Sequence, residues 1–248
     1  MPNVITRGIP NTVTCLNLFS GCMACVEASE AKYEWAAVFI ILSAIFDFFD
    51  GLLARLFKVY SPNGKELDSL ADDISFGLAP ALILFSLFKE VSYPSFLLGL
   101  KGYIPYLAFL IAVFSALRLA KFNIDTRQSR SFIGLPTPAN ALFWASIAMS
   151  IHHHSASSTS HILYLLVALT FLFSWLLVAE IPMFSLKFEN LSWKDNKISF
   201  IFLTGCLPLF VILKTGGFAA IIGWYILLSL LAKKKMKQFL RDNCLISL

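Results

Sequence analysis

The chain has 248 residues, of which 58% are hydrophobic and only 14% are charged, and its mean hydropathy is +0.74. This composition is far too apolar for a soluble globular domain. Long apolar stretches recur along the whole sequence without a polar linker between them. We therefore expect a single integral membrane domain over residues 1–248, with an all-α fold built as a transmembrane helical bundle.

The apolar stretches predict the membrane spans in chain order. A helix needs about 20 residues to cross a hydrocarbon core of roughly 30 Å. Polar or turn-forming breaks separate about eight such stretches, within a range of six to eight, at residues 11–28, 34–57, 68–88, 96–122, 136–152, 161–181, 198–214 and 217–232. The fourth is interrupted near Pro105, and the last two are joined by the short turn "KTGG".

The distribution of basic residues predicts the orientation. Lys and Arg collect in the cytoplasmic loops of membrane proteins. With eight spans, all but four of the 20 basic residues fall on one side, and the four exceptions are Lys32, Lys89, Lys101 and Lys214. The sequence therefore predicts that both termini lie in the cytoplasm of a protein integral to the cell membrane. The net charge of +5 is mainly a signal of this topology.

Four aspartates interrupt the second and third predicted spans, within "DFFDGLLARLFKVYSPNGKELDSLADD". Asp47 and Asp50 are three residues apart, and Asp68 and Asp72 are four apart, so each pair shares one face of a helix. The loop at 58–66 is short enough to make the two helices antiparallel neighbours. The sequence therefore predicts that four carboxylates converge near the cytoplasmic face of the membrane.

Such a cluster requires a positive charge among its members. Four like charges in a low-dielectric pocket would otherwise repel one another and take up protons. Ligation by oxygen alone favours Mg²⁺, Mn²⁺ or Ca²⁺ over zinc, and four acids are enough for two ions. Gly51 and Ala54 lack bulk, so a ligand or a neighbouring helix can approach them, and Arg55 is placed to bind a phosphate. The residues alone leave two alternatives open, a cation-transport pathway and a structural ion-pair network.

The spacing from Asp47 to Asp72, D-x2-D-G-x2-A-R-x8-G-x3-D-x3-D, resembles the signature of the CDP-alcohol phosphotransferase family of integral membrane enzymes. All eight positions of the pattern are present. The resemblance extends over about residues 9–188, beginning with "IPNTVTCLNLFSG" at 9–21. The segments "ALRLAKFNIDTRQSRSFIGLPTPANA" at 116–141 and "SWLLVAEIPMFSLKF" at 174–188 resemble the branch of the family that uses serine as the acceptor. Residues 189–248 add two spans and a basic tail.

The resemblance implies a reaction in which CDP-diacylglycerol and L-serine give phosphatidylserine and CMP, and it suggests a homodimer. It implies Mg²⁺ or Mn²⁺ as the cofactor, with two ions and four ligands, Asp47, Asp50, Asp68 and Asp72. It also implies a cradle for the CDP group formed by Gly51, Ala54, Arg55 and Gly64. Further nucleotide contacts are expected from two residues of the first span, Thr14 and Asn17.

The general base and the acceptor pocket are assigned within the same framework. We predict Asp72 as the base because it alone keeps the four-residue spacing from Asp68, whereas Asp73 lies about 100° further round the helix. Because an arginine fork suits the carboxylate of serine, we expect serine to contact Arg118 or Arg130, with Asn123 as a polar contact. Glycerol 3-phosphate or inositol phosphate as the acceptor would leave the aspartate site intact, so these alternatives stay open.

Overall fold

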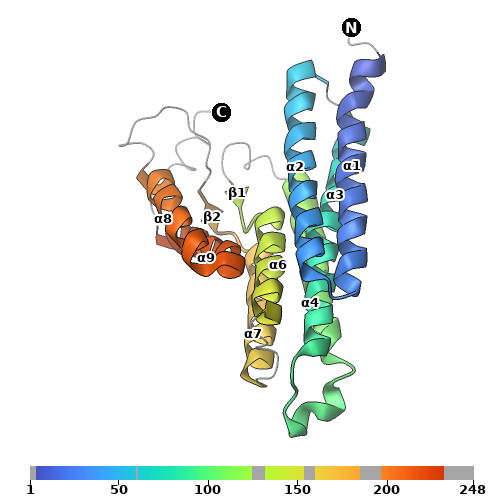
Figure 1. Ribbon diagram of the computed structural model, residues 1–248. Helices are drawn as coiled ribbons and strands as arrows, with labels where there is room; N and C mark the ends of the chain where they lie inside the picture. The colour runs from blue at the N-terminus through green and yellow to red at the C-terminus, as the bar shows by residue number, and fades with distance from the viewer. Residues whose placement is uncertain (1–3, 60, 125–131, 154–159, 185–196, 232–248) are drawn as a thin grey trace.

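The computed structural model describes residues 4–59, 61–124, 132–153, 160–184 and 197–231 (Figure 1). Apart from one pair of two-residue strands, the regular structure in these residues is helical, which confirms the predicted fold class. The α-helices are α1 Val4–Ser29, α2 Tyr33–Phe57, α3 Pro62–Asp72, α4 Ala79–Glu90, α5 Phe109–Ile124, α6 Thr137–His153, α7 Ser160–Val178, α8 Lys197–Leu213 and α9 Gly217–Leu231.

Short elements of other kinds join several of these helices. A π-helical segment, η1 Asp73–Leu78, links α3 and α4 without a break. Three 3₁₀ segments follow, η2 Ser95–Leu100, η3 Ile104–Ala108 and η6 Lys214–Gly216. The strands β1 Phe132–Ile133 and β2 Pro182–Met183 pair antiparallel.

Six helical stretches in the described residues are long and apolar enough to cross a membrane. Each of the eight predicted segments contains a helix, but α6 has only 17 residues, and α8 and α9 have 17 and 15. The stretch Lys197–Leu231 folds back at η6, as the close contact between Gly205 of α8 and Trp224 of α9 shows. The fourth span begins at Ile104 rather than at residue 96, since the region with Gly99 and Gly102 forms 3₁₀ and turn structure instead.

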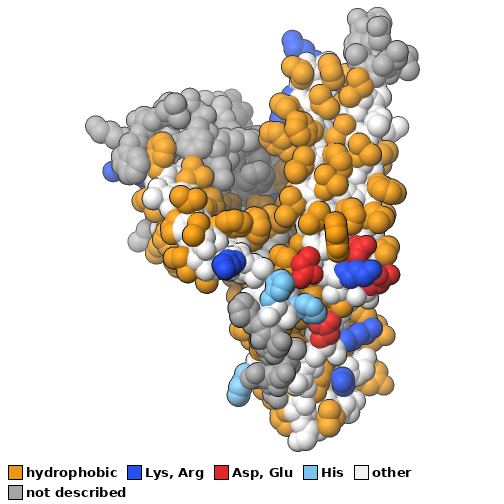
Figure 2. Space-filling model, in the orientation of Figure 1, with side chains coloured by type: hydrophobic (Ala, Val, Ile, Leu, Met, Phe, Trp, Pro, Cys, Tyr) orange, Lys and Arg blue, Asp and Glu red, His pale blue; other side chains and the backbone are white. Residues whose placement is uncertain are grey.

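Contacts between distant segments define two ends of the helical bundle. At the end where α2 leads into α3, here called the α2–α3 end, Lys65 donates to the carbonyl of Asn123 at the end of α5. At the end where α1 turns into α2, here called the α1–α2 end, the side chains of Glu34 and His153 meet. Figure 1 shows α1 and α2 running side by side between these two ends. Figure 2 shows apolar side chains covering the face formed by α1 and α2, with charged and His side chains gathered towards the α1–α2 end.

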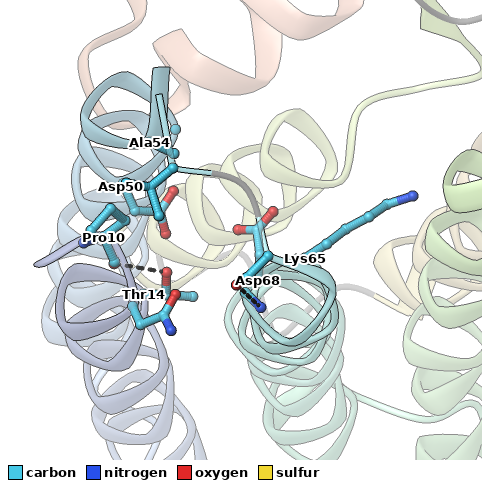
Figure 3. A pocket seen from close by; sticks show the side chains of 11 residues that line it. Pro10, Thr14, Asp50, Ala54, Lys65 and Asp68 are labelled. Atoms are coloured by element: carbon cyan, nitrogen blue, oxygen red, sulfur yellow. Dashed lines mark hydrogen bonds between the residues drawn. The ribbon is translucent and has the colours of Figure 1, made fainter. Parts of the chain in front are cut away.

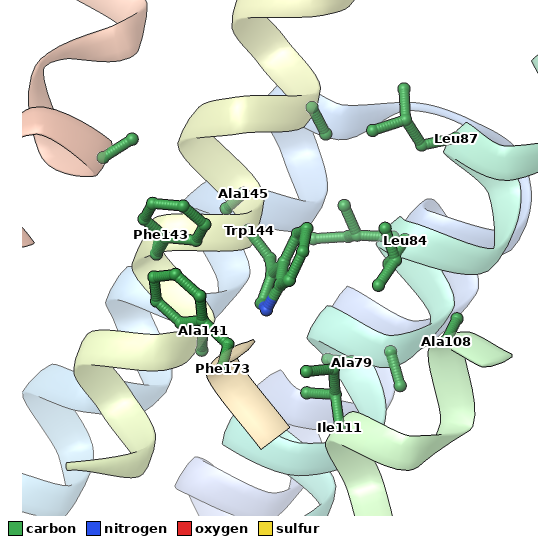
Figure 4. Close-up of a cluster of buried hydrophobic side chains, with 14 of the residues drawn as sticks. Ala79, Leu84, Leu87, Ala108, Ile111, Ala141, Phe143, Trp144, Ala145 and Phe173 are labelled. Atoms are coloured by element: carbon green, nitrogen blue, oxygen red, sulfur yellow. The ribbon is translucent and has the colours of Figure 1, made fainter. Parts of the chain in front are cut away.

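The largest buried side chain in the core is Trp144 of α6, which is fully buried against α4 and α7 (Figure 4). Phe143 and Phe173 stack beside it with ring centroids 3.9 Å apart. The indole N–H donates to Asn140 Oδ1 one turn earlier, at 3.2 Å, so the ring buries no unpaired donor. The contact between Trp144 and Phe173 thus joins α6 to α7 in the core.

Gly134 fixes the chain between α5 and α6 against the end of α7. Its φ is +79°, a conformation that L side chains rarely adopt, and a Cβ there would lie 2.6 Å from the carbonyl oxygen of Leu177. Its N–H donates to the carbonyl of Ile181, and the next residue, Leu135, donates to that of Leu176. Glycine is therefore required where α6 begins beside the end of α7.

Candidate active site

The loop between α2 and α3 positions the two helices that carry the carboxylates. Helix α2 ends at Phe57, and Lys58 then adopts a left-handed conformation with φ 52°. Ser61 caps α3, because its side chain accepts a hydrogen bond from the N–H of Gly64 at 3.0 Å, and Pro62 occupies the first helical turn. A Cβ at Gly64 would lie 2.9 Å from the Ser61 Oγ, so the cap itself favours glycine here.

Three of the four predicted carboxylates form one group. Asp47 and Asp50 of α2 and Asp68 of α3 each place an oxygen within 4.8 Å of the other two. Asp50 is only 6% exposed. One oxygen of Asp50, Oδ2, and one of Asp68, Oδ1, are buried and have no hydrogen-bond partner among the residues that the structure describes. Burying unpaired charge is costly, so this arrangement fits a site that a cation completes.

Asp72 lies beside this group but is held differently. It is close enough to Asp47 and Asp68 for their charges to act on it. Its Oδ1 accepts a hydrogen bond from Asn17 Nδ2 of α1 at 3.2 Å. Asp72 is therefore placed next to the three clustered carboxylates, with one oxygen engaged by α1.

A pocket of about 200 Å³ opens beside the carboxylates, between α1, α2 and α3 (Figure 3). Figure 3 shows Asp50 and Asp68 on opposite sides of this space, with Thr14 below Asp50. The predicted nucleotide contacts that line it are Thr14, Gly51, Ala54 and Gly64. Residues that the sequence reasoning missed also line it, namely Pro10, Asn11, Val59, Ser61 and Lys65.

Gly51 differs from Gly64, the other glycine in the pocket lining, because a Cβ added to Gly51 would meet no described atom within 4 Å. Glycine is thus not needed there for the helices to pack. Open space beside a helical glycine next to a carboxylate cluster fits a position that a ligand approaches closely.

Two predicted nucleotide contacts are placed away from the pocket. Asn17 is fully buried, and the pocket lining does not include it. Its side-chain amide contacts Asp72 and Ser75 instead, so the structure does not support a direct nucleotide contact. Arg55 is exposed on α2 and is also outside the pocket lining. Its contact with a phosphate stays a prediction.

Among the predicted acceptor-binding residues, Arg118 of α5 has the surroundings that best fit ligand binding. It is 7% exposed, and in the described part of the chain its Nε has no hydrogen-bond partner. Its guanidinium carbon lies 5.9 Å from the ring centroid of Phe122, and the charge of Asp72 acts on it. A buried arginine with an unused donor beside Asp72 is suited to an anionic group of a substrate.

The other two predicted acceptor contacts differ from Arg118. The amide of Asn123 donates to Ser69 Oγ of α3 at 2.7 Å, so Asn123 also joins α5 to α3. Arg130 lies outside the described residues. The direct contacts of both residues with serine stay predictions.

Sequence comparisons address the family. The family described as CDP-alcohol phosphatidyltransferase matches residues 7–176, a range that contains all four aspartates. Two relatives are named CDP-diacylglycerol--serine O-phosphatidyltransferase. The one from Helicobacter pylori (strain ATCC 700392 / 26695) is 40% identical over 135 residues, 54% of each chain. The one from Bacillus subtilis (strain 168) is 34% identical over 130 residues, 52% of this chain and 69% of the relative.

A third relative, from Methanothermobacter thermautotrophicus, is named archaetidylserine synthase. It is 32% identical over 144 residues, 57% of this chain and 58% of its own. The chain thus matches about half the length of the Helicobacter and Methanothermobacter relatives. The match of the family over residues 7–176, together with the carboxylate group inside that range, shows that the chain belongs to the CDP-alcohol phosphatidyltransferase family.

Proposed function

We propose that this membrane protein transfers the phosphatidyl group of CDP-diacylglycerol to the hydroxyl of L-serine, releasing CMP. The observation that carries the proposal is the group formed by Asp47, Asp50 and Asp68 beside a pocket, within the range matched by the family. The names of all three relatives above refer to serine, which supports serine as the acceptor.

The carboxylates fit Mg²⁺ or Mn²⁺. They offer only oxygen donors, and the unpartnered oxygens of Asp50 and Asp68 are available to a cation. Asp47, Asp50 and Asp68 would hold the metal ion, and Asp72 would be a further ligand. As predicted from the four acids, a second ion would bind at the same site. When bound, the metal would neutralise charge on the phosphate oxygens.

The pocket residues would hold the CDP group of the lipid substrate. Gly51 and Ala54 line one side of the pocket along α2, and Gly64 lines the start of α3. Small residues let phosphates approach the backbone, and Arg55 would contact a phosphate from the exposed side of α2. Holding the reacting phosphorus in line with the incoming hydroxyl supplies much of the catalysis in phosphoryl transfer.

Asp72 and Arg118 would act on serine. Arg118 would bind the carboxylate of serine through its unused donor. The serine oxygen would form a bond to the phosphorus that carries the diacylglycerol, and the bond from that phosphorus to CMP would break. Asp72 would take the hydroxyl proton, since a serine hydroxyl is a poor nucleophile until its proton is accepted.

The predicted location of the site completes the proposal. The six long apolar helical stretches of the described residues support an integral membrane protein. Arg55, Lys58, Lys65 and Lys121 all lie where helices meet at the α2–α3 end, which by the positive-inside rule would face the cytoplasm. A homodimer and cytoplasmic termini stay predictions from the family resemblance and from the distribution of charge.

The deciding experiment measures CMP release from CDP-diacylglycerol by the purified protein with Mn²⁺ or Mg²⁺, using serine, glycerol 3-phosphate and inositol phosphate in turn. We expect turnover with serine alone, and loss of it in Asp72→Asn but not in the neighbouring control Asp73→Asn. Turnover with glycerol 3-phosphate but not serine would contradict the choice of acceptor. Cation flux without any need for a cytidine nucleotide would favour a transporter instead.

A further inference from the structure

Asn17 of α1 joins the two helices that carry the carboxylates. Its Nδ2 donates to Asp72 Oδ1 on α3 at 3.2 Å. Its backbone carbonyl accepts a hydrogen bond from Ser43 Oγ on α2 at 3.1 Å, and Ser43 lies one turn before Asp47. Asn17 therefore contacts both halves of the carboxylate site, although it does not line the pocket.

Ser75 sets the orientation of the Asn17 amide. The hydroxyl of Ser75, in the π-helical segment, lies 2.9 Å from Asn17 Oδ1 and 3.2 Å from the Asn17 carbonyl oxygen, and it donates to them. Because this hydroxyl proton engages the oxygen of the amide, the nitrogen is directed to Asp72. Both residues are fully buried, so water does not compete for these bonds.

Gly21 lets α1 approach Ser75 closely enough for this contact. A Cβ at Gly21 would collide with the Oγ of Ser75 and would lie 2.9 Å from its Cα. The close contact between α1 and η1 therefore depends on glycine at position 21, which lies one turn along α1 from Asn17.

We propose that Ser75 and Asn17 are positioning residues that fix Asp72 relative to Asp47, with Ser75 acting through the amide of Asn17. Ser75 is not part of the aspartate pattern in the sequence. The proposal rests on the proposed function for the role of Asp72 in the reaction, but the geometry that it describes also sets the metal site.

The structure offers a matched control in Ser86. Ser86 of α4 is also buried and donates to a carbonyl of α1, that of Ala28, at 2.7 Å. Within the described part of the chain it makes no hydrogen bond with an aspartate, and it lies beyond the π-helical segment. Ser86→Ala therefore removes a comparable bond between α4 and α1 and leaves Asn17 intact.

The test compares Ser75→Ala, Asn17→Ala and Ser86→Ala in two measurements, Mn²⁺ binding without substrate and CMP release with serine. Loss of a group that orients metal ligands weakens metal binding or activity by about 10- to 100-fold, so we expect Asn17→Ala near the upper value and Ser75→Ala near the lower. The KM for CDP-diacylglycerol should change less than kcat, because the pocket lining is intact. Ser86→Ala should match the wild type in both measurements.

A double-mutant cycle separates positioning from general loss of stability. Because Ser75 acts through Asn17, adding Ser75→Ala to Asn17→Ala should cost little more, whereas independent sites add. The proposal would be overturned if the losses of the two single variants multiplied in the double variant. It would also be overturned if Ser75→Ala behaved as Ser86→Ala does. If Ser75→Ala does not fold, Ser75→Cys keeps nearly the same volume with a weaker donor and is held to the same outcomes.

The two readouts distinguish this proposal from the proposed function. If the wild type binds Mn²⁺ but gives no CMP with serine, the proposed function fails, and the Mn²⁺ measurement still decides the role of Ser75. If the wild type is active and the Mn²⁺ affinities and kcat values of Ser75→Ala and Asn17→Ala are those of the wild type, the positioning proposal alone fails.

Discussion

Two sets of acidic residues at opposite ends of the bundle, the glutamates beside His152 and His153 and the aspartates of the cluster, are held in opposite ways. At the α1–α2 end, Glu34 lies 3.2 Å from His153 and Glu90 lies 3.7 Å from His152, and the side chains are about a third to a half exposed. In the cluster, Asp50 and Asp68 each keep a buried oxygen that has no hydrogen-bond partner among the described residues. Pairing with a histidine accounts for Glu34 and Glu90, whereas the unpartnered oxygens of Asp50 and Asp68, which lie beside a pocket, fit the site of a ligand.

Asp68→Asn gives the largest expected effect, because it removes one of three clustered carboxylates. Loss of metal-assisted charge stabilisation should lower kcat by about 1,000-fold, which corresponds to about 4 kcal/mol. The melting temperature in EDTA should stay the same or rise, since an unpartnered buried charge is removed. CMP release and thermal melting check the two effects. Glu34→Gln at the opposite end is the control and should retain activity.

Addition of Mn²⁺ should stabilise the wild type but not Asp68→Asn. A ligand at 100 times its Kd stabilises the folded state by about 2.7 kcal/mol when it binds the folded state alone. Thermal unfolding with and without the metal measures this difference. An equal shift in both proteins would mean that Mn²⁺ binds elsewhere, and it would remove the contrast between the two ends.

Gly51→Ala should weaken the binding of CDP-diacylglycerol without lowering the stability of the fold. The new methyl group meets no atom of the described residues within 4 Å, and alanine is favoured over glycine in a helix by up to about 1 kcal/mol, so the fold should be no less stable. The methyl group would occupy space proposed for the CDP group, and we expect the KM for CDP-diacylglycerol to rise about 10-fold.

Gly223 of α9 provides the matched control for Gly51. It is also a helical glycine, and a Cβ added to it would meet no atom of the described residues within 4 Å; it lies outside the residues matched by the family. Gly223→Ala should leave the KM unchanged. Equal KM values for Gly51→Ala and Gly223→Ala would argue against a ligand beside Gly51.

His153→Ala gives the smallest expected effect. The pair that it forms with Glu34 is about half exposed, and such pairs contribute at most about 1 kcal/mol. We expect a slight loss of thermal stability and unchanged CMP release. A large loss of activity would show that the α1–α2 end takes part in the reaction.

The sequence predicts the parts of this structure that depend on local pattern. Apolar length predicts where helices lie, and the spacing of Asp47, Asp50 and Asp68 predicts that their carboxylates meet. These features follow from helix periodicity and a short loop, which a single segment of sequence contains.

The features that the sequence does not predict depend on contacts between distant segments. The sequence predicts Asn17 as a nucleotide contact. Its position on the first span does not reveal that its side chain faces Ser75, which lies 58 residues later in the chain. Gly51 and Gly21 are both glycines in helices, yet only the packing shows that one faces open space and the other faces Ser75. The π-helical geometry of Asp73–Leu78 likewise has no recognised signal in the residue pattern.

That π-helical segment divides one continuous helix into two parts, and the side chains of each part point in directions that differ from those of the other part. On one side of it, α3 directs Asp68 and Asp72 towards α1 and α2, and on the other side α4 directs Leu84 and Leu87 into the core around Trp144 (Figure 4). Each residue of an α-helix advances the side chains by about 100°, so a single residue inserted or deleted there would misalign one set with respect to the other. The length of this stretch is therefore as much a part of the site as the identity of its aspartates.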